Sequence, residues 1–245
     1  MTKYGLGRNV SPFDHRDYSL TAFMPRGVFK ISPIAEMRWD FPSESLNQND
    51  SSHCTGFSAA AFGICSPIND NYTNDDGHRF YYLCKVEDGE PNMENGSNIR
   101  SVAKVLRNVG RIDGYAFAPN VDSIKWWVLN KGPLIVGTIW MTSMFEPDEN
   151  GIIQISGSVI GGHAYLIDEY RKDGYFGFQN SWGDFWGEFG RAYISVENFG
   201  KIFRYGGEAL TSVELPLIGA TSQEGNIGCL QLIANLIKGF FSKNK

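Results

Sequence analysis

The chain has 245 residues, a hydrophobic fraction of 42% and a formal net charge of −5 at pH 7. This composition supplies enough apolar surface for a packed core, which excludes a disordered chain, and the negative charge excludes a fold that is basic overall, as expected of many nucleic-acid-binding domains. No apolar run approaches the ~20 residues that a membrane-spanning helix needs.

The first 45 residues mix Pro, Gly, Asp and Arg and show no sustained helical or strand period. We expect residues 1–45 to form an extended, irregular arm rather than an independent domain. The N-terminus lacks the apolar stretch and the small-residue cleavage site of a secretory signal. The sequence therefore favours a cytoplasmic or virus-associated protein over a secreted one.

Three helices are expected in the first half of the chain. Residues 57–65 are small and apolar on every side, which predicts a helix buried almost all round. A second helix is predicted to start at Ser97 as its N-cap, because apolar residues follow at helical spacing. A third is predicted from Asp122, as its cap, to the Gly-Pro pair at 132–133.

The pattern then changes to strands, at residues 134–140, 164–167, 174–179 and 191–196, separated by Gly and Asp turns. Helices followed by strands predict an α+β fold with a helical lobe and a sheet lobe. We place a domain at residues 46–214, with the helical lobe at about 46–132 and the sheet lobe at about 133–214.

The tail is separate from this domain. Residues 215–228 have a linker composition, and residues 229–241 show an apolar helical pattern followed by lysines. Such a helix could lie on a membrane surface or in a groove of a protein partner. The alternative is a helix packed back on the body or used as an oligomer contact.

Cys54 directly precedes the buried helix. Backbone N–H groups and the positive end of the helix dipole would lower the pKa of a thiol placed there, and a thiolate is the reactive form of cysteine. The alternative is that Cys54 is a small buried hydrophobic residue, as most free cysteines are.

Two later segments favour the reactive interpretation. His163 stands at the start of an apolar strand, and Asn180 opens a run flanked by tryptophans. A cysteine nucleophile, a histidine base and an asparagine that orients the histidine form the Cys-His-Asn version of the catalytic triad.

These residues lie in motifs that resemble those of the papain-like cysteine peptidases. Gln48 stands six residues before Cys54, residues 162–164 match the Gly-His-Ala box, and residues 180–190 match Asn-Ser-Trp-Gly-x-x-Trp-Gly-Glu-x-Gly throughout. The resemblance covers residues 40–200 roughly, and the segments 14–18 and 96–101 are similar to a microbial or viral branch. It implies two lobes, one helical and one an antiparallel sheet, with the active-site cleft between them.

The resemblance also implies a mechanism. The Cys54 thiolate, paired with His163, would attack a peptide carbonyl of a polypeptide substrate and form an acyl-enzyme. Gln48 and the Cys54 backbone N–H would hold the oxyanion, and Asn180 would fix the His163 ring.

Three further residues are implied in the substrate site. Trp182 would shield the histidine, while Gly162 and Gly96 would offer backbone to an extended substrate. No residue spacing implies a metal or an organic cofactor, and the resemblance suggests that residues 1–45 include a short pro-segment. Substrate preference is encoded by no single motif.

The sequence departs from the family pattern beside the nucleophile. Ser51 replaces the first cysteine of Cys-Gly-Ser-Cys-Trp, which suits a reducing compartment, and Thr55 replaces the tryptophan. His53 is expected at the rim of the site and not as the base.

Other titratable residues have ordinary interpretations. Cys65 and Cys84 are expected in the core, and Asp168 and Glu169 as solvated turn residues.

Two other functions remain open. The fold could serve as a catalytically inactive binding or structural module, for example in a virus particle. A cysteine acyltransferase or a cell-wall amidase also uses a cysteine and then a histidine, but residues 178–190 fit papain better.

Overall fold

The computed structural model describes residues 4–25 and 35–214, and the chain divides after Val213 into two compact units. The predicted linker and apolar helix at 215–245, with Cys229, lie outside the described residues.

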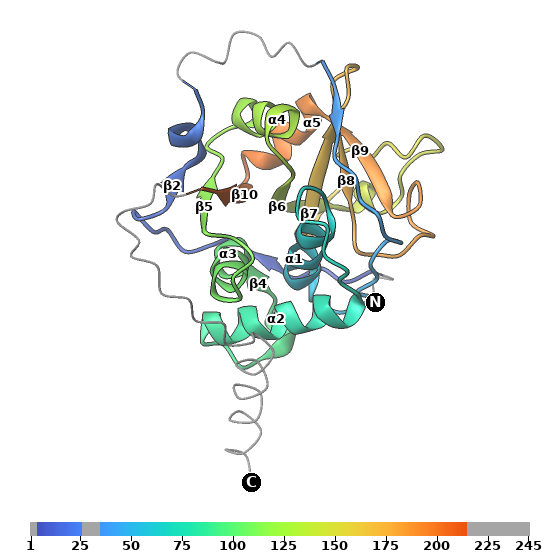
Figure 1. Cartoon of the computed structure of the whole chain (residues 1–245). Coiled ribbons are helices and arrows are strands. Elements are labelled where there is room, and N and C mark those ends of the chain that lie inside the picture. Colours follow the sequence, from blue (N-terminus) through green and yellow to red (C-terminus); the bar gives the residue numbers. More distant parts are fainter. Residues whose placement is uncertain (1–3, 26–34, 215–245) are drawn as a thin grey trace. The chain divides into compact units, whose positions relative to one another are not determined.

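The first unit carries its helices mainly before its long strands (Figure 1). The helices are α1 (Cys54–Ile64), α2 (Asn74–Asp88), α3 (Ile99–Asn108), α4 (Val121–Asn130) and α5 (Val196–Phe203), with 3-10 turns at Leu20–Phe23, Met93–Asn95 and Thr142–Phe145. The strands are β1 (Arg8–Asn9), β2 (Tyr18–Ser19), β3 (Met37–Arg38), β4 (Ser97–Asn98), β5 (Gly114–Phe117), β6 (Leu134–Met141), β7 (Val159–Tyr170), β8 (Tyr175–Gln179), β9 (Arg191–Ser195) and β10 (Glu208–Val213). The α+β prediction is confirmed.

A large sheet runs in the order β2-β5-β10-β6-β7-β8-β9, with β3 paired to β7. It is mixed rather than purely antiparallel, because β2 pairs with β5 in parallel. A second, two-stranded sheet joins β1 to β4, also in parallel. The N-terminal arm therefore adds β1 to the small sheet, and β2 and β3 to the large one.

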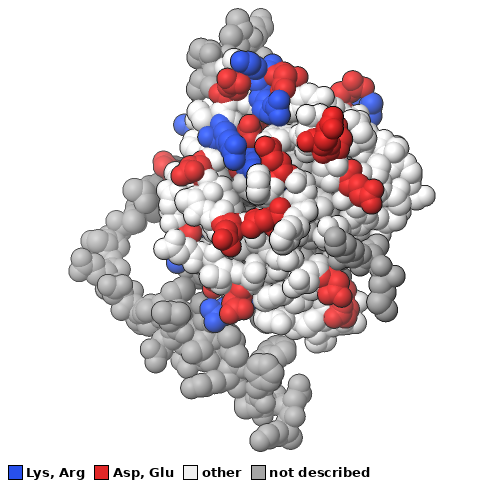
Figure 2. Space-filling view, turned by 90° about the vertical axis from the view of Figure 1, so that its right-hand side faces the viewer, with Lys and Arg blue, Asp and Glu red and all other residues white. Residues whose placement is uncertain are grey.

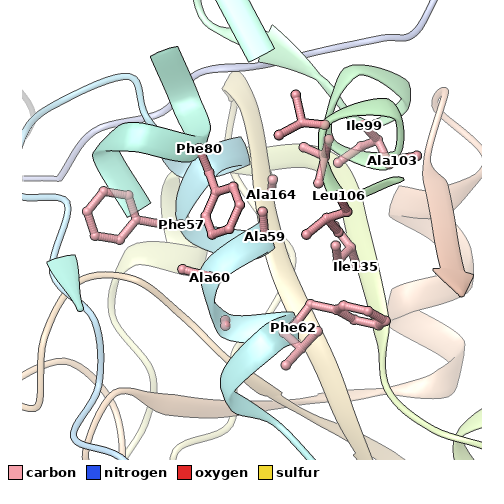
Figure 3. Close-up of a cluster of buried hydrophobic side chains, with 14 of the residues drawn as sticks. Phe57, Ala59, Ala60, Phe62, Phe80, Ile99, Ala103, Leu106, Ile135 and Ala164 are labelled. Carbon is pink, nitrogen blue, oxygen red and sulfur yellow. The ribbon is translucent and has the colours of Figure 1, made fainter. Parts of the chain in front are cut away.

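The core lies where α1 packs against β7 and α3 (Figure 3). Every residue of α1 is buried, as its small apolar sequence predicts. Phe57 and Phe62 of α1 belong to one buried cluster with Leu106 of α3 and Ile135 of β6, and Phe57 lies on the side of Phe80 of α2. Cys65 and Cys84 are free and buried, so their assignment to the core is confirmed. This packing holds the first turn of α1 beside the sheet.

Two helix starts differ from the prediction by one or two residues. The N-cap of α3 is Asn98 and not Ser97, since the Asn98 side chain accepts from the Ser101 N–H. The N-cap of α4 is Asn120, which forms a capping box with Ser123, and not Asp122. In each case an asparagine was in reach of the free backbone N–H groups and took the capping role.

The surface agrees with the negative charge of the chain. Figure 2 shows acidic side chains scattered over the face that it presents, interrupted by basic ones, without a continuous basic area among the described residues of that face. Within residues 4–25 and 35–214, no helix has the length and apolar character required to cross a membrane.

Candidate active site

Cys54 is the first residue of α1, as predicted, and its side chain is fully buried. The backbone amides of Ala164 on β7 and of Gly7 in the arm lie near the sulfur, where they favour the thiolate and lower the pKa of Cys54. The thiol therefore faces the β7 residue that comes directly after His163.

His163 lies on β7 and is fully buried. Its Nε2 is 2.7 Å from Oδ1 of Asn180, and the same oxygen accepts from the Ser181 N–H at 2.8 Å. An amide oxygen only accepts, so Nε2 carries the proton. The other ring nitrogen, Nδ1, is buried and has no hydrogen-bond partner, which leaves it free to act as a base.

Aromatic rings enclose this pair. The Trp182 ring stacks on His163 with centroids 4.6 Å apart and an angle of 27°, and Trp140 meets the same ring edge-on at 4.8 Å. Trp182 is itself buried, at 3% exposure. The two indoles keep water from the hydrogen bond between His163 and Asn180.

Gln48 is held by Ser181, the residue that follows Asn180. Its Oε1 accepts from the Ser181 hydroxyl at 2.6 Å, and its backbone N–H donates to the Ser181 carbonyl at 2.8 Å. These bonds orient the side-chain amide, whose Nε2 donates to the carbonyls of Ser51 at 2.6 Å and Gly5 at 3.3 Å. Ser181 was not singled out in the sequence analysis, although it lies inside the Asn-Ser-Trp motif.

Residues 4–9 of the arm fill the space over Cys54. The Gly7 N–H donates to the Gly162 carbonyl at 3.1 Å, and the Gly7 carbonyl accepts from the Ser97 N–H at 2.9 Å. A Cβ at Gly5 or at Gly7 would stand 1.9 Å from the carbonyl oxygen of Ser51 or Ser52, respectively. Only glycine fits at these two positions. The Gly-Leu-Gly sequence at residues 5–7, which the sequence analysis did not use, is the local pattern that indicates this close packing of the backbone.

Both ends of this segment are anchored by side chains. At one end the Tyr4 ring stacks on Trp182 with centroids 4.7 Å apart. At the other end Arg8, whose side chain is 2% exposed, pairs with Glu208 and donates to the Gly206 carbonyl at 2.6 Å. The segment thus passes from the aromatic side of the site to β10.

Burial sets the charge state of the reactive pair. It raises the pKa of the Cys54 thiol to about 11, against the opposing effect of the Ala164 and Gly7 amides. It also lowers the pKa of His163 to about 4, against the bond to Asn180. The expected low thiol pKa is therefore wrong for this arrangement, because burial removes the water that would stabilise a thiolate.

The candidate substrate residues lie around the arm. Gly162 accepts from it through its carbonyl, but Gly96 does not bond to it, and the neighbouring Ser97 does so instead. The Gly96 carbonyl accepts from Lys85 at 2.8 Å. Of the candidate site residues only Gly96 lines a surface pocket of about 580 Å³, so this pocket is not the space over Cys54.

Three neighbouring residues differ from expectation. His53 is not at the rim: it is 8% exposed, stacks on Tyr81 with centroids 3.8 Å apart, and its Nδ1 lies 2.7 Å from Nδ1 of His78. Asp168 is fully buried and Glu169 half-buried, and both pair with Arg191 of β9. Their charges are neutralised within the sheet and not by solvent.

Comparison with known proteins identifies the family. The papain family cysteine proteases match over residues 49–203. The chain belongs to this family. Among curated protein sequences none matches it.

Solved structures show the same fold. Xylellain, a cysteine protease from Xylella fastidiosa, is 20% identical over 86% of this chain and 97% of its own, with a TM-score of 0.71. Procathepsin B S9 from Trypanosoma congolense is 12% identical over 86% of each chain, with a TM-score of 0.65. The Carica candamarcensis protease CMS1MS2, in complex with E-64, is 14% identical over 74% of this chain and 98% of its own, with a TM-score of 0.54. The papain-like two-lobe prediction is thus confirmed.

Proposed function

We propose that this member of the papain family hydrolyses peptide bonds with Cys54 as nucleophile, His163 as acid and base, Asn180 as the residue that orients His163, and Gln48 in the oxyanion hole. The observation that carries the proposal is the state of the His163 ring. Nε2 is bound by Asn180 while Nδ1, beside the residue that contacts the Cys54 thiol, is free.

The steps are derived from these positions. His163 Nδ1 takes the thiol proton, and the sulfur attacks the carbonyl carbon of the substrate. The oxyanion accepts from Gln48 Nε2 and from the Cys54 N–H, and one such donor contributes about 3–4 kcal/mol. When the C–N bond breaks, His163 protonates the leaving amine. It then takes a proton from the water that hydrolyses the thioester.

We further propose that the form described here is latent. Gly7 of the arm lies beside the thiol, and the Gly5 carbonyl occupies the amide donor of Gln48 that the oxyanion would need. The arm therefore covers the cysteine and fills the oxyanion hole. Its displacement would readmit water, lower the thiol pKa and raise that of His163.

The second candidate is an inactive binding module of the same fold. The buried thiol with a raised pKa is the observation that favours it. Displacement of the arm distinguishes the two candidates, since only a peptidase then has a reactive Cys54.

The test is the intact mass of the full chain after treatment with an epoxysuccinyl inhibitor. We compare the wild type with Gly5→Ala/Gly7→Ala, in which the added methyl groups cannot be seated against Ser51 and Ser52. We expect slow labelling of the wild type and labelling at least about tenfold faster in the double variant. Cleavage of a peptide substrate should rise in parallel.

Two controls assign the signal. Cys54→Ala in the double variant should remove the adduct. Gly132→Ala tests the same change where a Cβ meets only an atom 3.9 Å away, and it should label like the wild type. A double variant that is folded and labelled but cleaves no peptide in a broad library would contradict the peptidase and favour the binding module.

A further inference from the structure

The side chain of His53 leaves the turn that carries the nucleophile and packs on helix α2. His53 directly precedes Cys54 and is the N-cap of α1, where its carbonyl accepts from the Phe57 N–H at 3.1 Å. An N-cap of serine, threonine, asparagine or aspartate bonds the free N–H groups of the first turn through its side chain. His53 makes no such bond. The orientation of this turn therefore depends on what holds the His53 ring.

Two rings of α2 hold His53. The Tyr81 ring stacks on it with centroids 3.8 Å apart and an angle of 15°. Nδ1 of His78 lies 2.7 Å from Nδ1 of His53, within hydrogen-bond distance. The half-buried His78 ring also meets Phe57 edge-on, with centroids 4.9 Å apart. His78 thus contacts residues on both sides of Cys54 in the sequence.

The packing of the two helices fixes the distance between the imidazoles. A Cβ at Gly56 of α1 would lie 2.3 Å from the carbonyl oxygen of Gly77 on α2, and a Cβ at Gly77 would lie 2.9 Å from the Phe57 ring. The backbones of α1 and α2 are therefore in close contact three residues after His53 and one residue before His78. The two imidazoles cannot adjust their distance by a shift of one helix toward the other.

This short distance limits the number of protons that the pair can hold. A neutral imidazole has one N–H and one lone pair, so a bond between two Nδ1 atoms needs a proton on one and a lone pair on the other. When both rings are cations, both Nδ1 atoms carry protons, the bond is lost, and two like charges face each other. Burial and the charge of His78 both lower the pKa of His53, to about 4. The second protonation thus belongs to the acidic range.

The other titratable groups around the pair do not offset this repulsion. Tyr81 and Tyr82 are phenols, which are uncharged in acid, and the Cys54 sulfur faces Ala164 of β7. The carboxylates of the neighbouring segments are exposed or already paired, so solvent and partner screen them. They are Asp50 before α1, Asp75 of α2, Glu94 in the turn after α2, and Asp76, which pairs with Arg79. The charge that acts on His53 is that of His78.

The peptide between His53 and Cys54 carries the N–H that the proposed mechanism uses to bind the oxyanion. From this arrangement we propose that His78 is a positioning residue for that N–H. It holds the His53 ring through the bond between the two Nδ1 atoms, and it releases the ring when the pair takes up its second proton. The effect on the reaction rests on the proposed peptidase function, whereas the coupled titration of the pair does not.

The experiment compares the full chain carrying Gly5→Ala/Gly7→Ala with the same protein carrying also His78→Asn or His78→Phe. Two rate constants are measured between about pH 7 and about pH 4. One is kcat/KM for a peptide coumarin amide, whose hydrolysis passes through an oxyanion. The other is the alkylation of Cys54 by iodoacetamide, which displaces iodide and forms no oxyanion. Both need the ionised Cys54, so their ratio isolates the oxyanion donors.

With His78 present, the ratio should be constant near neutral pH and fall at least about tenfold toward pH 4. His78→Asn keeps a donor and an acceptor but does not titrate, so it should retain the neutral ratio and hold it in acid. His78→Phe keeps a ring without the bond and should lower the ratio at every pH. His15→Asn removes an exposed histidine of the arm and is the matched control. A ratio that falls equally in His78→Asn, or that His78→Phe leaves unchanged, overturns the proposal.

A second measurement separates the pair from the chemistry. Proton NMR follows the imidazole resonances of the wild-type chain during an acid titration, with His78→Asn to assign them. Steps at least about one pH unit apart for the two rings, with His53 titrating at higher pH in His78→Asn, support the pair. If no variant hydrolyses peptide while these steps are seen, the peptidase proposal fails by itself. Independent titration of the two rings overturns the pair proposal whatever the activity.

Discussion

Two buried arginines of this protein differ in what their ion pairs join. Arg191 on β9 donates to Asp168 at 2.6 and 3.0 Å and to Glu169 at 2.7 Å, so three bonds link two strands of one sheet. Arg8 meets Glu208 and one carbonyl through a single nitrogen, and the Nε of both arginines is buried without a hydrogen-bond partner. The first pair belongs to the sheet, whereas the second holds a segment that covers the active site.

The difference shows that burial alone does not make an ion pair part of the fold. Asp168 keeps the pKa of Arg191 above its usual range although burial acts against the charge, and neither partner can reach water without breaking the sheet. Arg8 can leave with the arm, after which both it and Glu208 gain water. Breaking the pair of Arg191 should therefore lower the free energy of unfolding, whereas breaking the pair of Arg8 should mainly increase the access of reagents to Cys54.

The largest expected effect is on the sheet pair. Asp168→Ala leaves the Arg191 guanidinium buried with Glu169 as its only carboxylate, and removing one partner of such a pair costs about 3–5 kcal/mol. Denaturant unfolding should show this loss. Asp173→Ala breaks an exposed pair with Arg171 and should cost about 1 kcal/mol or less. Equal losses in the two variants would refute the structural role of Asp168.

Arg8→Ala should reduce the stability of the protein less than Asp168→Ala does, but it should clearly increase the accessibility of Cys54. Arg8→Ala should raise the rate of Cys54 alkylation at least about tenfold, because the segment loses the anchor at its β10 end, while global stability falls by less than half of the Asp168→Ala loss. Arg16→Ala removes an exposed arginine of the same arm and is the matched control. An unchanged alkylation rate would mean that Arg8 does not hold the segment in place.

The smallest expected effect is a pH dependence of the stabilisation that residues 4–9 of the arm give to the protein. Burial lowers the pKa of His163 from 6.5 to about 4, so the covered state binds fewer protons than a state in which displacement of the arm admits water to the ring. The stabilisation by the arm should be complete above pH 6.5 and should fall as pH drops toward 4, by at most about 1.4 kcal/mol per unit.

The measurement is the difference in unfolding free energy between the wild type and Gly5→Ala/Gly7→Ala across this range. The difference should shrink in acid. Introducing His163→Gln into both proteins should make this difference independent of pH, because residue 163 then no longer titrates. This control distinguishes the titration of His163 from that of the carboxylates. A difference that grows as pH falls would contradict the assignment.

Local chemistry was sufficient to predict the scaffold of the site. The all-apolar surface of residues 57–65 predicted a buried helix, and α1 begins at Cys54. The strand that carries His163 was also predicted, although β7 extends from Val159 to Tyr170, beyond the 164–167 core. Both the helix and the strand could be predicted because each is determined by a pattern of side chains that are close together in the sequence.

The remainder depends on contacts that no local pattern contains. Helix α2 was missed because its sequence is largely polar, although the capping box formed by Thr73 and Asp76 is a local signal for its start. Asp168 looked like a turn residue because its partner, Arg191, is 23 residues away. The sequence predicted an extended arm but not where the arm lies. Its position depends on contacts with Ser97, Gly162 and Glu208, which only the folded sheets bring together.

The residues 180–182 give the site a property that its separate contacts do not suggest. Asn180 sets the proton on the imidazole of His163, Ser181 aims the amide of Gln48, and Trp182 covers the imidazole. Three consecutive residues therefore hold both groups that the proposed mechanism uses, the base and an oxyanion donor. A displacement of this tripeptide would move the base and the oxyanion donor together, so that the relative alignment of the two survives motions that would ruin a site assembled from independent loops.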